Sequence, residues 1–113
     1  MRLLLDSYME FGLANPNAYR LVFCARPQES HENEGTAAQK LGKQVFDSFA
    51  ETVGELAATG KLKAETQVAA QVLWGGCHGI VALIITKPYF PWAERSAVTK
   101  TMLDTLFDGL VAA

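Results

Sequence analysis

The sequence predicts an all-α domain. Four segments carry apolar residues at every third or fourth position, a spacing that places these side chains along one face of a helix. A fifth segment is apolar nearly all the way round. No segment shows the strict alternation of apolar and polar residues that is typical of a half-buried strand. The chain has 113 residues, half of them hydrophobic, which suffices for one domain with a core, near the size at which association with a partner often adds stability.

We expect the first helix at residues 2–14 and the second from residue 16 to about residue 24 or 25. The pair Asn15 and Pro16 between them is a helix-start signal, because an asparagine side chain can accept backbone N–H groups and proline has a fixed φ that suits a first turn. An Arg-Pro pair ends the second helix, and the polar segment 28–35 that follows is expected to form an exposed, mobile loop.

Three longer helices are expected in the rest of the chain. Residues 36–59 repeat apolar positions opposite charged ones, and Gly60 ends this helix as a C-terminal cap. Residues 65–86 are apolar nearly all the way round, which a helix tolerates only when it is covered on more than one side. The last helix is expected at residues 93–111, after a loop at 87–92 that two prolines fix. One central apolar helix among four amphipathic ones makes an all-α domain.

Composition argues against several classes of protein. Ten basic and twelve acidic residues give a net charge of −2, which lacks the basic footprint of a DNA-binding domain, so we expect no direct contact of this chain alone with DNA. The N-terminal apolar run is too short for a signal peptide. Gln71 and His78 interrupt the long apolar run 68–85, so we expect a core helix and no membrane span. Cys24 and Cys77 fit buried thiols in a reducing cytoplasm.

The neighbouring residues Cys77 and His78 raise the question of a metal or catalytic site. Adjacent side chains on a helix point about 100° apart, so the two cannot easily share one ion, and the other histidine, His31, lies in the expected loop. The same divergence argues against a nucleophilic Cys–His pair. We therefore expect no catalytic residues, no metal and no cofactor.

Helical spacing divides the segment VLWGGCHGIVAL, residues 72–83, between two faces. One face carries Trp74 and His78, whose polar atoms either contact a ligand or are satisfied by neighbours in the core. The other face carries glycines. A glycine inside a helix costs about 1 kcal/mol relative to alanine, so close approach of a second helix is the expected compensation. Aromatic side chains of the other helices either fill the core or line a cavity.

Three motifs, taken in order, resemble the C-terminal domain of TetR-family transcriptional regulators. Trp74, His78 and Gly79 in LWGGCHGIVAL resemble the Trp, His-Gly signature of that domain. FGLANPNAYRLVF, residues 11–23, is similar to the family's segment in which one helix ends before a proline and the next begins. PYFPWAERSAVTKTMLDTLFDGL, residues 88–110, is similar to the family's last helix with its aromatic-proline lead-in. Together the motifs extend over nearly the whole chain.

The sequence departs from the family pattern at three places. Residues 63–65, Lys-Ala-Glu, stand where relatives often have an Asp-Pro helix start, and Gly75 and Gly76 replace larger residues that often follow the tryptophan. The N-terminal helix-turn-helix domain, whose recognition helix enters the major groove, is absent from this sequence. The resemblance thus implies one domain, residues 1–113, corresponding to the sensing and dimerising half of a regulator.

The resemblance implies a five-helix domain that forms a homodimer through a four-helix bundle made by the last two helices and their copies. It further implies a small hydrophobic effector bound among the helices of a cytoplasmic protein. The expected effector-site residues are Phe11, Tyr19, Phe23, Phe46, Phe49, Gln71, Trp74 and His78. The expected dimer-interface residues are Val72, Gly75, Gly76, Gly79, Leu83, Met102, Leu103, Leu106 and Leu110. One alternative is a helical dimerisation module without a ligand; the other is a small cytosolic enzyme, which would require His78 beside a buried carboxylate.

Overall fold

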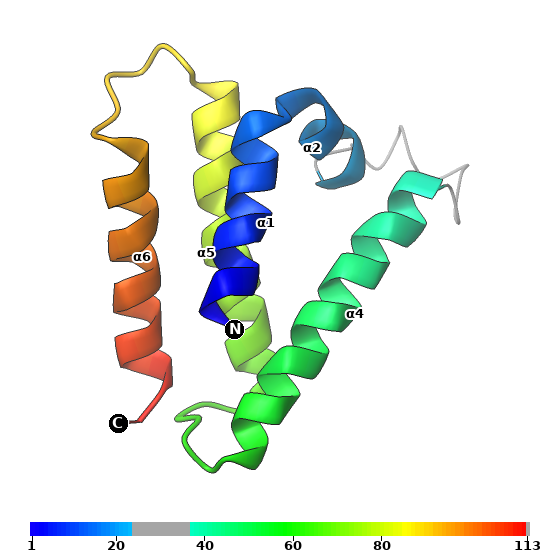
Figure 1. Cartoon of the computed structure of the whole chain (residues 1–113), viewed down its shortest axis with the longest axis vertical. Helices are drawn as coiled ribbons and strands as arrows, with labels where there is room; N and C mark the ends of the chain where they lie inside the picture. The colour runs from blue at the N-terminus through cyan, green and yellow to red at the C-terminus, as the bar shows by residue number, and fades with distance from the viewer. Residues whose placement is uncertain (24–36, 113) are drawn as a thin grey trace.

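The structure, a computed structural model, describes residues 1–23 and 37–112, and this part of the chain folds into five helices (Figure 1). In chain order they are α1 (Arg2–Ala14), α2 (Pro16–Phe23), α4 (Ala37–Ala58), α5 (Thr66–Thr86) and α6 (Arg95–Leu110). The all-α prediction and the five expected helices are confirmed. The expected loop at 28–35, with His31, and the neighbouring Cys24 lie outside the described residues.

The helix ends follow the sequence signals, with one change of role. Gly60 has a positive φ of 77° and ends α4, as expected of a C-terminal cap. The Glu65 side chain accepts the Val68 N–H at 3.1 Å, so it caps the start of α5. Asn15 caps the helix before it: its side-chain amide donates to the Phe11 carbonyl at 3.0 Å. At the start of α2 the Asn15 backbone carbonyl accepts the Tyr19 N–H at 2.9 Å, and among the described residues no hydrogen bond joins the Asn15 side chain to an N–H group of α2.

α5 is the central helix of the fold. In Figure 1, α5 and α1 lie in the middle, α6 lies on one side, and α4 runs diagonally on the other side with α2 near its upper end. Contacts with α1, α4 and α6 cover α5, as its apolar sequence predicted. The core is made by buried side chains of all the described helices: Leu5, Met9, Tyr19, Phe49, Val53, Ala69, Ala70, Leu73, Cys77, Val81, Ile85 and Leu103.

One face of α5 is not covered within the subunit. Val68, Val72 and Leu83 are 52%, 40% and 49% exposed, and less than half of the most apolar stretch of the helix is buried. The described part of the chain measures 41 × 37 × 19 Å, so it is thin in one direction. α5 is long and apolar enough to cross a membrane, a property that core helices of soluble proteins share.

Polar contacts attach α6 to the start of α1 and to the connection between α4 and α5. Arg2, at the start of α1, pairs with Asp104, which also pairs with Lys100 one turn away. Leu62 and Val111 form an isolated antiparallel bridge, so the connection between α4 and α5 is paired with the chain just after α6. Ion pairs at such exposed positions contribute little stability each, and the apolar contacts of α6 with α5 fix its place.

Candidate functional site

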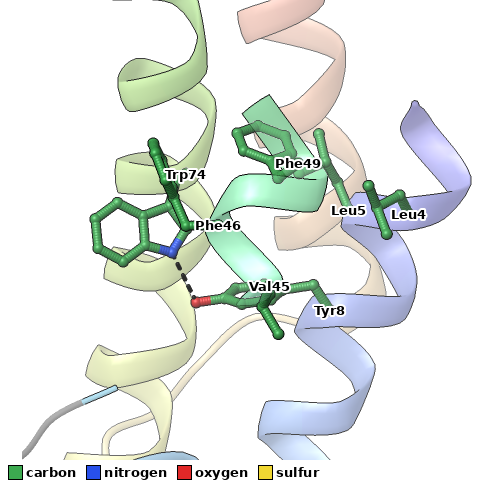
Figure 2. Close-up of a pocket in the computed structure, with 7 residues that line it drawn as sticks. All are labelled: Leu4, Leu5, Tyr8, Val45, Phe46, Phe49 and Trp74. Atoms are coloured by element: carbon green, nitrogen blue, oxygen red, sulfur yellow. Dashed lines mark hydrogen bonds between the residues drawn. The ribbon is translucent and has the colours of Figure 1, made fainter. Parts of the chain in front are cut away.

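A continuous chain of hydrogen bonds joins α1, α2 and α5 inside the domain. The Trp74 indole N–H donates to the Tyr8 hydroxyl at 3.2 Å (Figure 2). The hydroxyls of Tyr8 and Tyr19 are 2.7 Å apart, and the Tyr19 hydroxyl is 2.6 Å from His78 Nδ1. Trp74 and His78 lie one turn apart on α5, so both ends of this four-residue hydrogen-bond chain are on one helix face.

The direction of this hydrogen-bond chain depends on which ring nitrogen of His78 carries the proton. An indole N–H can only donate, and a neutral imidazole with its proton on Nε2 accepts at Nδ1. In that tautomer of His78, donation runs from Trp74 through Tyr8 and Tyr19 to His78. Burial lowers the pKa of His78 below its usual value, which favours the neutral form that can accept. In the described part of the chain, every buried side-chain polar atom has a hydrogen-bond partner.

Helix α2 is oriented by a second polar contact with α5. The Arg20 guanidinium donates to the Ile85 carbonyl at 2.7 Å, at the end of α5 where carbonyl groups lack partners within the helix. This contact holds α2 against α5, and the neighbouring Tyr19 is fully buried at 0% exposure. Sequence reasoning missed Arg20 and also Tyr8, because a tyrosine at core spacing does not reveal which distant hydroxyl it meets.

Six of the eight expected effector-site residues meet in one group of rings. The Tyr19 ring lies 4.9 Å from that of Phe23 and 5.6 Å from the His78 ring. The Phe46 ring lies 5.5 Å from Trp74, edge to face, and 6.3 Å from Phe49. The two remaining residues, Phe11 and Gln71, are exposed, and each lines an open hollow at the border of this group.

A small enclosed cavity lies between α1, α4 and α5. Its volume is about 30 Å³, which is room for about one or two water molecules and far below the roughly 300–1,000 Å³ of typical ligand sites. Figure 2 shows its lining, with the Trp74 to Tyr8 hydrogen bond at one edge. The lining residues are Leu4, Leu5, Tyr8, Val45, Phe46, Phe49 and Trp74.

Two open hollows border the enclosed cavity. One, of about 320 Å³, lies between α1, α2 and α4 and shares Leu4, Tyr8 and Val45 with the cavity. The other, of about 650 Å³, lies between α2, α4 and α5 and shares Phe46 and Trp74 with it. Both volumes fall in the range of small-molecule sites. Side chains of α1, α4 and α5 thus separate the small cavity from the two larger open hollows.

The expected dimer residues divide between the surface and the interior. Val72 and Leu83 are exposed, and a Cβ added at Gly75 or Gly79 would meet nothing within 4 Å. With Val68, these residues form a continuous apolar stripe along the uncovered face of α5. We call this set the α5 stripe: Val68, Val72, Gly75, Gly79 and Leu83.

Two expected dimer residues serve packing within the subunit. A Cβ at Gly76 would lie 2.8 Å from Leu106 and 3.3 Å from Met102, so Gly76 gives α6 close access to α5. Leu103 is fully buried in the core and has no surface to offer a partner. Met102, Leu106 and Leu110 are partly buried, and the first two also line an open groove of about 530 Å³ along α6.

Cys77 and His78 point to different surroundings. Cys77 is fully buried, and burial, followed by the nearby charge of Asp6, raises the pKa of its thiol to about 12. A thiol with so high a pKa is a poor nucleophile. No carboxylate in the described part of the chain is buried, so the described residues offer His78 no buried acidic partner. No group of three or more metal-binding side chains occurs among them either.

Together, the central apolar helix, the ring group beside a small cavity and the α5 stripe define an all-α domain with one uncovered apolar face. The family comparison agrees: the chain belongs to the tetracyclin repressor-like C-terminal domain family, whose model matches residues 1–109. The resemblance inferred from the three motifs is thereby confirmed at the level of the family. Searches of curated proteins and of solved structures gave no match. Domains of this family are parts of transcriptional regulators, a class of proteins that are generally not enzymes.

Proposed function

We propose that this chain is the effector-sensing and dimerisation domain of a TetR-like transcriptional regulator in the cytoplasm. A small hydrophobic molecule binds among the helices and modulates DNA binding by a helix-turn-helix domain outside this sequence. Such regulation requires that the effector bind two conformations of the domain with different affinities.

The main support for this proposal is the position of α5, which carries both required features. Trp74 faces the ring group and the enclosed cavity, and His78 faces the ring group, whereas Gly75 and Gly79 lie on the uncovered face. A shift of α5 that accommodates an effector therefore also moves the face that meets a partner. Packed side chains transmit such shifts because protein interiors are close to crystalline density.

The second part of the proposal is a homodimer formed by α5 and α6 with their copies. The α5 stripe is apolar and leaves Gly75 and Gly79 open, which suits a close helix contact across a two-fold axis. The residues proposed for this contact are Val72, Gly75, Gly79, Leu83, Met102, Leu106 and Leu110.

A matched pair of glycine substitutions tests the dimer. In the isolated subunit, a Cβ at Gly79 and one at Gly54 of α4 both meet open space, so we expect one subunit to accept both Gly79→Leu and Gly54→Leu. In the dimer only the first fills the contact between helices. Sedimentation should show weaker association for Gly79→Leu and wild-type association for Gly54→Leu. An unchanged dimer in the Gly79→Leu variant would place the interface elsewhere.

The effector site is tested by the fluorescence of Trp74. Trp92, in the loop before α6, is first replaced with phenylalanine so that Trp74 is the only reporter. Titration with a panel of hydrophobic compounds should then give a saturable change in emission. A variant with Trp92 retained and Trp74 replaced by phenylalanine serves as the control for changes that do not arise at the cavity.

A second candidate function is a helical dimerisation module that binds no ligand. Two observations favour it: the enclosed cavity holds only about 30 Å³, and Trp74 and His78 are already hydrogen-bonded within the domain. A dimer that responds to no compound of the panel, in emission or in unfolding temperature, would support this second candidate over effector sensing.

A further inference from the structure

We propose, on the basis of the effector-sensing function above, that the effector is an uncharged aromatic compound and that Phe46 is the side chain it displaces. Phe46 lines both the enclosed cavity and the open hollow of about 650 Å³. Its ring therefore stands in the wall between a space that is too small for a ligand and one that is large enough.

Phe46 is the movable member of this wall. Trp74 lines the same two spaces but is held by its hydrogen bond to Tyr8 and by a ring contact with His78 at 5.7 Å. The Phe46 side chain has no polar atom, and among the described residues its ring contacts those of Trp74 at 5.5 Å and Phe49 at 6.3 Å. Displacing the Phe46 ring breaks no hydrogen bond and joins the cavity to the hollow.

The lining selects against charge. Tyr8 is the one lining residue of the enclosed cavity with an ionisable side chain, and its hydroxyl is hydrogen-bonded to that of Tyr19. The open hollow adds Lys43, which is largely exposed and already paired with Asp47 at 2.8 Å. A charged group on the ligand would lose its hydration without gaining a buried partner, which is costly. The ligand that fits is uncharged.

The place that the Phe46 ring vacates selects for another ring. Trp74 lies edge to face with the Phe46 ring, and Phe49 lies at a tilt to it. A flat aromatic ligand in that place regains these contacts, which are worth more than the burial of area alone. A saturated ligand of equal size regains only the burial. Ring-to-ring contacts thus distinguish an aromatic compound from an aliphatic one of the same volume.

The test compares three probes of similar size by NMR, following the Trp74 indole N–H signal of the full chain. Naphthalene is uncharged and aromatic, decalin is uncharged and saturated, and 2-naphthoate is aromatic and anionic. We expect naphthalene to bind at least about tenfold more tightly than 2-naphthoate and at least about threefold more tightly than decalin. Equal affinity for naphthalene and decalin, or for naphthalene and 2-naphthoate, would overturn the proposed ligand class.

Two variants test the role of Phe46. Phe46→Ala should bind naphthalene about tenfold more tightly than the wild type, because two ring contacts no longer have to be broken. Phe46→Leu, which keeps more of the core, should show a smaller gain. Phe90→Ala, at an exposed position in the loop before α6, is the control and should bind like the wild type. Unchanged or weaker binding in the folded Phe46 variants would overturn the assignment.

The outcomes also separate this inference from the proposed function. In one outcome, none of the three probes binds but a different hydrophobic compound gives a saturable change in Trp74 emission. The proposed aromatic class and the role of Phe46 are then wrong, while effector sensing stands. If no compound binds the wild type or Phe46→Ala, both the inference and effector sensing fail.

Discussion

Replacing Tyr19 with phenylalanine removes the centre of the four-residue hydrogen-bond chain while keeping the ring. The Tyr19 side chain is 0% exposed, and its oxygen lies 2.7 Å from the Tyr8 oxygen and 2.6 Å from His78 Nδ1. Two hydrogen bonds at roughly 0.5–1.5 kcal/mol each give an expected loss of about 1–3 kcal/mol in the free energy of unfolding. Water cannot readily replace the lost hydroxyl at a buried site.

Urea unfolding followed by circular dichroism measures this loss. With a slope of about 1–3 kcal/mol per molar urea, the midpoint should fall by about 1 M for Tyr19→Phe. The control is Tyr89→Phe, the same chemical change at a side chain that is 98% exposed, where the midpoint should not move. If both variants unfold at the wild-type midpoint with an unchanged slope, the hydrogen-bond chain does not stabilise the fold.

Three further predictions concern close packing, pH and the buried thiol. Gly12→Ala should destabilise the domain by about 1–3 kcal/mol, because its Cβ would lie 2.6 Å from the Val81 side chain. Gly54→Ala, whose Cβ meets open space, should stabilise the domain by roughly 0.5–1 kcal/mol. Urea midpoints of the two variants that shift in the same direction would contradict these predictions. Because burial lowers the pKa of His78 from 6.5, the unfolded state takes up the proton first. The contribution of neutral His78 to the free energy of unfolding is then fully present above about pH 6.5 and is lost as the pH falls through the folded-state pKa. Thermal unfolding of the wild type and of His78→Gln between pH 5 and pH 8 measures this contribution. An equal pH dependence of the two unfolding temperatures would count against it. Cys77, whose pKa is raised to about 12, should react with a thiol reagent only at the rate of unfolding, in a variant whose other cysteine is replaced; rapid labelling of the folded protein would show that the thiol is accessible.

The helices were predictable because their signals are local. Apolar spacing and breakers such as Gly60 act within one or two turns, and the five expected segments match the observed helices to within a few residues. Asn15 shows the limit of such signals. An asparagine side chain both donates and accepts, so the sequence indicates a helix boundary there but not which of the two helices the side chain caps.

The candidate site was predictable in part. Helical spacing put Trp74 and His78 on one face, but their partners are 66 and 59 residues away in the chain, and only the tertiary fold brings them together. The glycines show the same limit. Gly75 and Gly76 differ by about 100° around the helix, and the rotation of α5 against α6, which decides that Gly76 faces inward, is set by packing with residues distant in sequence.

The α5 stripe is the feature on which the proposed function most depends, because a second copy of the chain bound there would cover the face of α5 that is exposed in one subunit. Sedimentation equilibrium of the chain at micromolar concentration tests it most directly. The account predicts a particle of twice the 12.3 kDa mass of one chain. A folded monomer of 12.3 kDa under these conditions would contradict it.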